Sequence, residues 1–342
     1  MKKLRILVLV REGLVPPATL EGFSDEEILN WKVEFDVVAT LKEMGHEVRP
    51  LGVIDDLGPI RQMIMDWSPD ITFVLLEEFH GVPTYDYAIV SYLELMRQHY
   101  TGCNPIGMML SRNKAFTKRI LSYHRIPTPQ FAVFPLGRKV KRPKRLEFPL
   151  LVKSAVEDAS FGIAQASIVG NDASLVERVK FVHESIGSDA LAEQYVEGRE
   201  LYVGVVGNQR LQSFPTWEMD FSRMPDDAAR IATAKVKWDL KYRKKYGIDT
   251  GPAGDLPPGM ELRIAKICKR VYRALNMSGY ARMDLRLRSD GRVYFLEANA
   301  NPDLAYGEDL AESAEIAGVP YDALLQRIIN LGLRYRAPWM VA

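Results

Sequence analysis

The clearest chemical pattern in the chain is a predicted hairpin (residues 281–299) that places two acidic side chains opposite each other. An Asp-Gly dipeptide separates two runs of alternating polar and apolar residues, which predicts a β-hairpin with a two-residue turn. In that register Asp284 faces Glu297, and Arg282 faces Asn299. Because side chains alternate along a strand, all four lie on one face.

Opposed carboxylates repel each other, at a cost of ~0.2–1 kcal/mol, so a partner must offset the repulsion. A hard divalent cation, Mg²⁺ or Mn²⁺, accepts such oxygen ligands, and the set Asp284, Glu297 and Asn299 predicts a metal site. Arg282 beside it would neutralise charge on a phosphate that the metal holds. The alternative is a solvated polar face on which Arg282 simply pairs with the acids.

Two lysines are candidate phosphate contacts. The chain has no Walker A motif and no GxGxxG after its first strand, so a nucleotide would need another cradle. Lys114 lies at the start of a predicted helix (residues 112–124), and Lys153 ends an apolar strand. Either would bind phosphate as a point charge, although each alone is also typical of a surface lysine. The turn EDASFG (residues 157–162) supplies backbone N–H groups for phosphate oxygens.

The helix around Lys114 is predicted to begin at Ser111 as its N-cap. Phe116, Ile120 and Tyr123 then recur at helical spacing and form its apolar stripe. Further along, the segment AEQYVEGRE (residues 192–200) joins two strands. Its backbone is a candidate for the purine edge and Glu200 for the ribose, whereas the plain alternative is a connecting loop.

Composition narrows the class of protein. A length of 342 residues predicts two or three domains, and a net charge of +1 argues against a nucleic-acid partner. Cys103 and Cys268 are too far apart in sequence to indicate a zinc cluster or a disulfide framework. The apolar run at residues 4–10 is too short for a signal peptide, and no run approaches the ~18 residues of a membrane span. These features predict a cytoplasmic protein without a membrane partner.

The elements that must position these residues follow a recognisable order. Strands at residues 4–10, 46–51 and 71–76 alternate with helical patterns, which predicts a Rossmann-like parallel sheet in an α/β domain over residues 1–105. Antiparallel strands and helices follow. The polar and basic stretch at residues 222–256 is long for a loop in a compact domain, and such loops are typically lids.

The order of these motifs resembles the ATP-grasp superfamily, and within it D-alanine–D-alanine ligase and its relatives. The matching segments are Lys114, VKSAVEDASFG, AEQYVEGRE, the basic loop, and RMDLRL…VYFLEANANP. The resemblance spans roughly residues 105–335 and is most specific at LEANANP. It implies an ATP-grasp fold of two α+β subdomains, residues 106–190 and 191–342, with the nucleotide between them.

The resemblance also implies roles for individual residues. Lys114 and Lys153 would bind ATP phosphates, Glu193 with Tyr195 and Val196 would meet adenine, and Glu200 would hold the ribose. Ser160, Phe161 and Gly162 would form the loop that covers the phosphates, and Lys237 would reach the γ-phosphate from the lid. Asp284, Glu297 and Asn299 would bind Mg²⁺, and Arg282 would stabilise an acyl phosphate and the tetrahedral state that follows.

The substrate segments depart from the family pattern. The family's acidic EREVSL-like run is replaced by REGLVPPATLEGFSDEE, and the lid has Trp238 where tyrosine is usual. After Pro302 the chain carries Asp303, Glu308 and Asp309 in place of a serine-bearing segment. We therefore expect an ATP-dependent carboxylate–amine ligase whose small-molecule substrates differ from two D-alanines.

Other functions stay open at this level. A true D-alanine–D-alanine ligase, another enzyme on the same core such as a carboxylase or kinase, and a nucleotide-responsive protein without turnover are the alternatives. The sequence also leaves open the pathway, the oligomeric state (a homodimer included) and whether Trp238 changes substrate choice.

Overall fold

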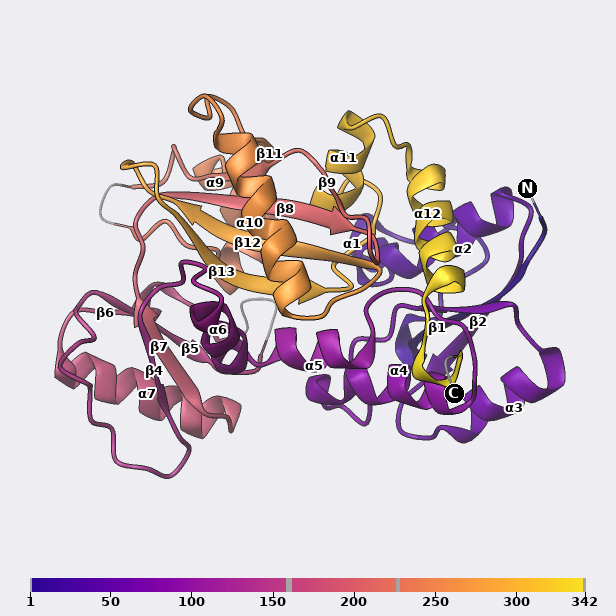
Figure 1. The fold of residues 1–342 in the computed structure, drawn as a ribbon, viewed down its shortest axis with the longest axis horizontal. Coiled ribbons are helices and arrows are strands. Elements are labelled where there is room, and N and C mark those ends of the chain that lie inside the picture. Colours follow the sequence, from indigo (N-terminus) through magenta and orange to yellow (C-terminus); the bar gives the residue numbers. More distant parts are fainter. Residues whose placement is uncertain (1, 158–161, 226–227, 341–342) are drawn as a thin grey trace.

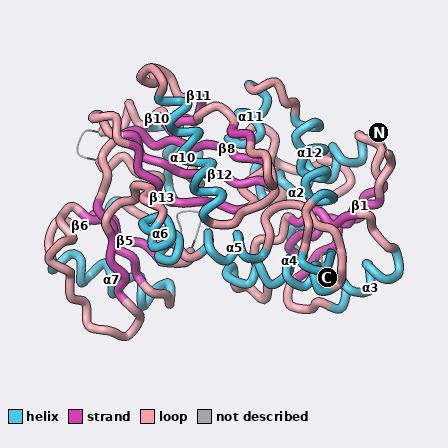
Figure 2. The backbone as a smooth tube through the Cα atoms, in the orientation of Figure 1, coloured by secondary structure: helices cyan, strands magenta, loops and turns pink. Residues whose placement is uncertain are grey.

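The computed structural model of the chain describes residues 2–157, 162–225 and 228–340. Within them, three sheets and their covering helices form an elongated molecule (Figure 1). Figure 2 shows the helices and strands along the same backbone. No helix among the described residues is long and apolar enough to cross a membrane.

The N-terminal sheet is parallel, as predicted. It contains β1 (Arg5–Arg11), β2 (Glu47–Val53) and β3 (Ile71–Val74) in the order β2-β1-β3. The central strand β1 is apolar on both faces because helices and further chain cover both. The helices of this region are α1 (Asp25–Asn30), α2 (Lys32–Glu43), α3 (Gly58–Trp67) and α4 (Asp86–Leu95).

Two helices lead out of this region, and here the prediction from sequence was wrong. Ser111 lies inside α5 (Pro105–Arg112), and Asn113 caps the next helix, α6 (Lys114–Tyr123), through bonds from the N–H groups of residues 115 and 116. The predicted apolar stripe is also wrong, because Phe116 and Tyr123 are exposed. The buried face of α6 instead carries lysines, which periodicity of apolar residues cannot reveal.

A four-stranded antiparallel sheet follows, with α7 (Asp172–Ile186) packed against it. Its strands are β4 (Phe131–Phe134), β5 (Leu150–Ser154), β6 (Ile168–Val169) and β7 (Ala190–Gln194), in the order β4-β7-β5-β6. Asn171 caps α7, and Gly187 ends it in the left-handed conformation that favours glycine. This region is the first of the two predicted α+β units.

The second unit is a six-stranded antiparallel sheet in the order β11-β10-β8-β12-β13, with β9 beside β8. The strands are β8 (Arg199–Val206), β9 (Gln212–Ser213), β10 (Trp217–Asp220), β11 (Asp249–Pro252), β12 (Tyr280–Leu287) and β13 (Val293–Ala300). Helix α10 (Met260–Ala274) lies across one face of the sheet (Figure 1). The predicted lid contains α8 (Ala234–Trp238) and α9 (Leu240–Tyr246), which pack with β10 around a small apolar core of their own.

The hairpin of β12 and β13 pairs Asp284 with Glu297 and Arg282 with Asn299, as predicted. The predicted two-residue turn is wrong, however. A backbone bond from the Arg288 N–H to the Arg292 carbonyl closes a three-residue loop in which Gly291 has φ +76°. Near this loop the register is shifted by one. A bulge at Leu296 shifts the register back, so that the acidic residues still face each other.

The C-terminal helices return to the start of the chain. Helix α11 (Asp309–Ile316) leads to α12 (Tyr321–Arg334), which contacts α2 and β3. Side chains of α12, among them Leu324 and Ile328, share one apolar core with Ile6 and Val8 of β1. Figure 1 shows this last helix beside the first strand and α2.

Candidate functional site

A cleft lies where residues of the two antiparallel sheets meet. The predicted site residues that line it are Lys153, Glu193, Tyr195, Val196, Glu200, Lys237, Asp284 and Glu297. They come from β5, from β7 and β8 with the connection between them, from the lid and from the hairpin. The structure thus brings together segments that lie more than a hundred residues apart in sequence.

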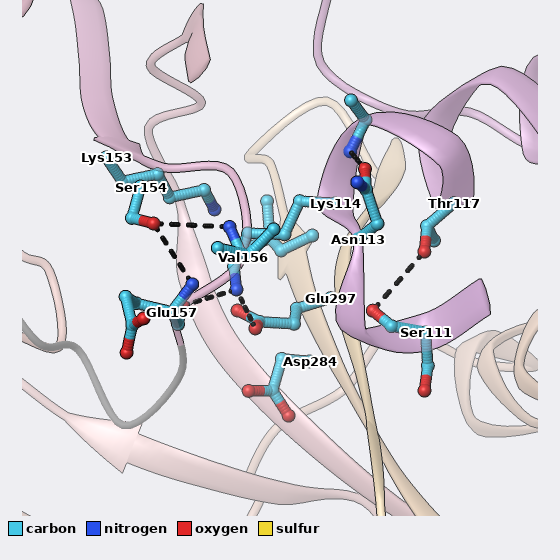
Figure 3. A network of polar contacts seen from close by, with 12 residues as sticks. Ser111, Asn113, Lys114, Thr117, Lys153, Ser154, Val156, Glu157, Asp284 and Glu297 are labelled. Carbon is cyan, nitrogen blue, oxygen red and sulfur yellow. Dashed lines mark hydrogen bonds and ion pairs between the residues drawn. The ribbon is translucent and has the colours of Figure 1, made fainter. Parts of the chain in front are cut away.

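Lys114 lies beside this cleft, in the first turn of α6, and contacts Glu297 of its lining. Its side chain is 3% exposed, and Nζ lies 2.8 Å from Glu297 Oε1 and donates to the Glu157 carbonyl at 2.6 Å. Figure 3 shows the Lys114 ammonium beside the Glu297 carboxylate, with Lys153 on one side of this pair and Asp284 on the other. The Lys114 ammonium neutralises the carboxylate of Glu297, which would otherwise repel that of Asp284 on the opposite strand.

Lys153 and Lys118 hold one carboxylate between them. The Nζ atoms of both lysines lie 2.7 Å from the two oxygens of Glu193. Burial alone would raise the pKa of Glu193, but the two ammonium groups hold it below its usual value. Burial lowers the pKa of the Lys118 ammonium, which Glu193 opposes. The Glu193 side chain therefore orients lysines, a role that the sequence prediction did not assign to it.

Lys118 is a site residue that the sequence argument missed. Its side chain is fully buried and also donates to the Leu296 carbonyl on β13. The available signal was spacing: Lys118 lies four residues after Lys114, and residues at i and i+4 share one helix face. Two lysines on the buried face of a helix indicate a binding site rather than a solvated surface.

Arg282 and Asp284 form a pair of their own. The guanidinium donates to both carboxylate oxygens, at 2.8 and 3.1 Å, and lies 3.8 Å from Asp309. It also lies over the Tyr202 ring, 4.9 Å from the centroid. Burial would lower the pKa of Arg282, but Asp284 and Asp309 raise it, so the group is a fixed cation.

The predicted metal ligands lie together on the hairpin. Asp284 is buried, and Glu297 and Asn299 are partly exposed on the opposite strand. No cluster of three or more His, Cys, Asp or Glu residues occurs in the described part of the chain. The set of two carboxylates and one amide nevertheless fits a hard cation. The ligand atom of Asn299 would be its amide oxygen, and its Nδ2 is buried without a hydrogen-bond partner among the described residues, which leaves this amide uncommitted to a protein partner.

Glu200 is oriented by two neighbours. Its Oε1 accepts a hydrogen bond from the Tyr202 hydroxyl at 2.9 Å, and its Oε2 accepts one from Arg286 at 2.5 Å. Arg286 is 3% exposed and lines the cleft, although the sequence argument gave it no role. In the register of the sheet, Arg286 on β12 lies directly opposite Glu200 on β8, and this pairing marks Arg286 as a residue of the site.

Two of the predicted phosphate-loop residues, Ser160 and Phe161, lie outside the described residues, as does the side chain of Trp238. Gly162 has φ +71°, and its carbonyl accepts a bond from Arg178. The lid meets this loop directly: the Ala234 N–H donates to the Ile163 carbonyl at 3.2 Å. Lys237 follows on α8 and lines the cleft from the lid side.

Comparison with known proteins agrees with this arrangement. The family model "D-ala D-ala ligase C-terminus" matches residues 120–330. A D-alanine–D-alanine ligase of Bordetella petrii is 31% identical over 76% of this chain and 75% of its own. An uncharacterized protein of Sinorhizobium fredii is 29% identical over 89% of this chain and 88% of its own.

The fold is also that of a solved ligase. A crystal structure described as D-alanine–D-alanine ligase from Bacillus anthracis complexed with ATP superposes with a TM-score of 0.73 at 23% identity, covering 97% of this chain and 98% of that one. The agreement extends over the N-terminal sheet and both antiparallel units. With the ATP-grasp fold present and the family model matching more than half of its residues, the chain belongs to the D-alanine–D-alanine ligase family of ATP-dependent ligases that form carbon–nitrogen bonds.

Proposed function

We propose that the cleft binds ATP with Mg²⁺ and that the protein joins a carboxylate to an amine through an acyl phosphate. One observation carries the proposal: Lys114 and Lys153 converge on the same cleft as the opposed carboxylates Asp284 and Glu297. Two cations beside two anions match a nucleotide whose phosphates carry negative charge and whose metal carries positive charge. The related ligase solved with ATP supports this assignment.

Each residue then has a defined task. Lys114 and Lys153 contact phosphate oxygens, the backbone of Tyr195 and Val196 meets adenine, and Glu200 holds the ribose. Asp284, Glu297 and Asn299 hold Mg²⁺, which when bound neutralises the phosphates. Lys114 then moves its charge from Glu297 to phosphate, since the two compete for one ammonium group.

The reaction has two steps. The substrate carboxylate attacks the γ-phosphorus of ATP, which releases ADP and leaves an acyl phosphate. The amine then attacks the acyl carbon, and phosphate leaves from a tetrahedral intermediate. Arg282, fixed by Asp284 and Asp309, stabilises the negative charge that develops on the oxygens. Lys237 on the lid covers the γ-phosphate, and the closed lid excludes water.

The metal assignment is tested by Glu297→Gln. The neutral amide keeps the shape of the side chain but weakens a hard-cation site, so ADP formation should fall by at least ~100-fold while the circular dichroism spectrum stays unchanged. Glu315→Gln on α11 is the matched control, because Glu315 is exposed and distant from the cleft lining. Wild-type turnover in Glu297→Gln would remove Glu297 from the metal site.

We further propose that the substrates are not two D-alanines. The segment after β13 places Asp303, Glu308 and Asp309 around the Arg282 side of the site. The pKa of Glu308 is raised to about 7 by partial desolvation and by the neighbouring carboxylates of Asp303 and Asp309, although the Glu308 and Asp303 side chains are exposed and only Asp309 is half-buried. A substrate carboxylate would meet repulsion here, whereas an amine or another cationic group would be stabilised.

Glu34 extends this acidic region from the N-terminal part. It is 6% exposed on α2, and burial together with the charges of Glu77 and Asp303 raises its pKa to about 7. The loop that carries Asp303 is fixed to the same helix, since Lys32 Nζ donates to the Tyr306 carbonyl and Asp36 accepts from the Tyr306 N–H. The acidic residues of both segments therefore belong to one surface.

A true D-alanine–D-alanine ligase is the second candidate. The observation in its favour is that relatives 26–31% identical to this chain carry that name. In this reading the acidic side chains face solvent, and other groups hold the carboxylate of the second substrate.

The two candidates are separated by a coupled assay of ADP release. Purified protein is tested with D-alanine alone and with a panel of amino acids, amino-acid amides and polyamines. We expect stimulation by an amine-bearing partner without a free carboxylate. Turnover with D-alanine alone at a typical enzyme rate, on the order of 1–10³ per second, would establish the second candidate instead.

A further inference from the structure

Arg286 is the buried residue of the cleft that the proposed chemistry leaves without a task. Its guanidinium donates to three acceptors: Nη1 to the Gly198 carbonyl at 2.7 Å, and Nη2 to Glu200 Oε2 and to the Arg230 carbonyl, each at 2.5 Å. Glu200 is the proposed ribose contact, and Arg230 belongs to the lid. One side chain therefore touches both the nucleotide site and the segment that covers it.

The contact with Glu200 leaves the carboxylate able to bind ribose. A carboxylate offers about four lone-pair positions, and Glu200 uses one on each oxygen for Tyr202 and Arg286. The remaining positions are free to accept ribose hydroxyls, while the two donors fix the plane of the group. Loss of either donor would let the carboxylate rotate away.

The contact with Arg230 is one of several that hold this end of the lid. One residue earlier, Ala229 pairs through both its N–H and its carbonyl with the side-chain amide of Gln165, at 2.8 and 2.9 Å. Gln165 comes from the central unit (the sheet of β4 to β7 with α7), near the phosphate loop, and Arg286 comes from the hairpin. The lid is thus attached to both walls of the cleft at adjacent residues.

We propose that Arg286 is a positioning residue that couples ribose binding at Glu200 to closure of the lid at Arg230. The inference rests on the proposed binding of ATP in this cleft. Because both acceptors share Nη2, the lid is best held when Glu200 is in its binding orientation, and the ribose site is best formed when the lid is docked. By linkage, ATP then favours the closed lid, and the closed lid favours ATP.

The neighbouring contacts allow the two halves of this coupling to be separated. Tyr202→Phe removes a donor to Glu200 and leaves the lid contacts in place. Gln165→Ala removes a lid contact and leaves Glu200 in place. Arg286→Lys keeps the positive charge but replaces the planar fork with a single point of donation, so it affects both. Arg288→Lys is the matched control, since Arg288 is an exposed arginine two residues further along the hairpin.

The experiment measures two quantities without any amino-acid substrate. The first is the affinity ratio, by calorimetry, for ATP over 2′-deoxyATP and 3′-deoxyATP. The second is the protection that ATP gives against trypsin cleavage at the exposed lid lysines Lys235, Lys244 and Lys245. We expect Arg286→Lys to lower the ribose preference roughly tenfold and to reduce the protection, because it loses a charge-assisted hydrogen bond.

The other variants give a distinct pattern. Tyr202→Phe should lower the ribose preference most and, through the coupling, the protection to a smaller extent. Gln165→Ala should show the reverse order, and Arg288→Lys should change neither quantity. Arg286→Gln, which keeps a planar polar head, replaces the lysine variant if that one does not fold. An Arg286 variant that melts at a lower temperature but keeps both wild-type values would overturn the coupling. Failure of the wild-type protein to bind ATP would overturn the proposed function as well.

Discussion

At the scale of single residues, the cleft is organised by buried charges that are all paired. Glu193 lies between Lys118 and Lys153, Glu297 contacts Lys114, and Asp284 contacts Arg282. Removing one member of such a pair leaves a buried charge without compensation, which typically costs about 3–5 kcal/mol. These pairs therefore fix the side chains of the cleft, and phosphates and a cation would bind by replacing one partner of a pair.

Outside the cleft, the buried carboxyl of Glu34 lies near Glu77 and Asp303, and it makes stability depend on pH. Its pKa is raised from 4.5 to about 7, so the folded protein binds this proton more tightly than the unfolded chain. The stabilisation is fully present below pH 4.5 and is lost as pH rises through about 7, a change on the order of 3 kcal/mol. The groups that face it are Glu77 and Asp303, with Lys32 and Asp36 on its own helix.

Glu34→Gln should remove this dependence, because the amide stays neutral at every pH. The variant should be more stable than the wild-type protein at pH 8 and show little advantage at pH 5, by chemical denaturation. Glu43→Gln, an exposed position on the same helix, should leave the wild-type dependence intact. A stability difference between Glu34→Gln and wild type that does not change with pH would contradict the assignment.

The sequence predicted those site residues that a local pattern marks and missed those that depend on contacts between distant segments or on an exception to the pattern. Asp284 and Glu297 were found because alternation along a strand is a strong local rule. Lys118 was missed because a buried lysine breaks the rule that apolar residues mark the buried face. The pairing of Glu200 with Arg286 depends on the register between β8 and β12, which are separated by more than seventy residues that include α8, α9 and α10.

At the scale of elements, the hairpin shows how a correct pairing can follow from an incorrect turn. The three-residue loop shifts the register by one, and the bulge at Leu296 shifts it back. The bulge coincides with a bond that leaves the sheet, in which the Phe295 N–H donates to the Pro127 carbonyl at 2.9 Å. Contacts with a distant loop fix the bulge, so the sequence of the hairpin alone could not predict it.

The start of β12 is fixed by a backbone crossing. Gly279 has φ +70°, and a Cβ atom there would lie 2.3 Å from the Gly102 carbonyl oxygen. Gly279→Ala should therefore destabilise the protein by about 2–4 kcal/mol, from the left-handed conformation and the steric overlap together. The measurement is the free energy of unfolding in denaturant.

Gly318→Ala serves as the control for that substitution. Gly318 has φ +77°, but a Cβ atom added there would meet no other atom within 4 Å. Gly318→Ala should lower the free energy of unfolding by about 1 kcal/mol, because only the left-handed backbone conformation opposes the new side chain. Equal losses at both positions would show that the crossing itself adds nothing.

At the scale of the whole molecule, the first sheet is completed by the last helix. Apolar side chains of α12 cover β1 and β3, and Gly332 lets this helix approach the backbone of Tyr100, whose oxygen would lie 2.3 Å from an added Cβ. The alternation of strands and helices predicted the N-terminal sheet correctly. It could not predict that a helix more than two hundred residues later would cover that sheet.

Deletion of residues 321–342, which removes α12, should therefore destabilise β1 near the start of the sequence. We expect the amides of Leu7, Val8 and Leu9 in β1 to lose their protection from hydrogen exchange, while those of the central unit around β5 and β7 keep theirs. Deletion of residues 338–342 alone, which leaves α12 in place, is the control. Retained protection of β1 in the longer deletion would show that the sheet is stable without its helix.

The position of α12 near the end of the sequence also determines when β1 can be covered during synthesis of the chain. At roughly 5–20 residues per second, a ribosome needs about 15–65 s to reach residue 321 after it has made β1. Throughout that interval the apolar side chains that α12 will cover, Ile6 and Val8 among them, face the surrounding water or another protein. The central unit has no such delay, because its covering helix α7 lies between its own strands in sequence. The nascent chain should therefore mature from its middle outward, and its first strand is the segment on which a chaperone would act longest.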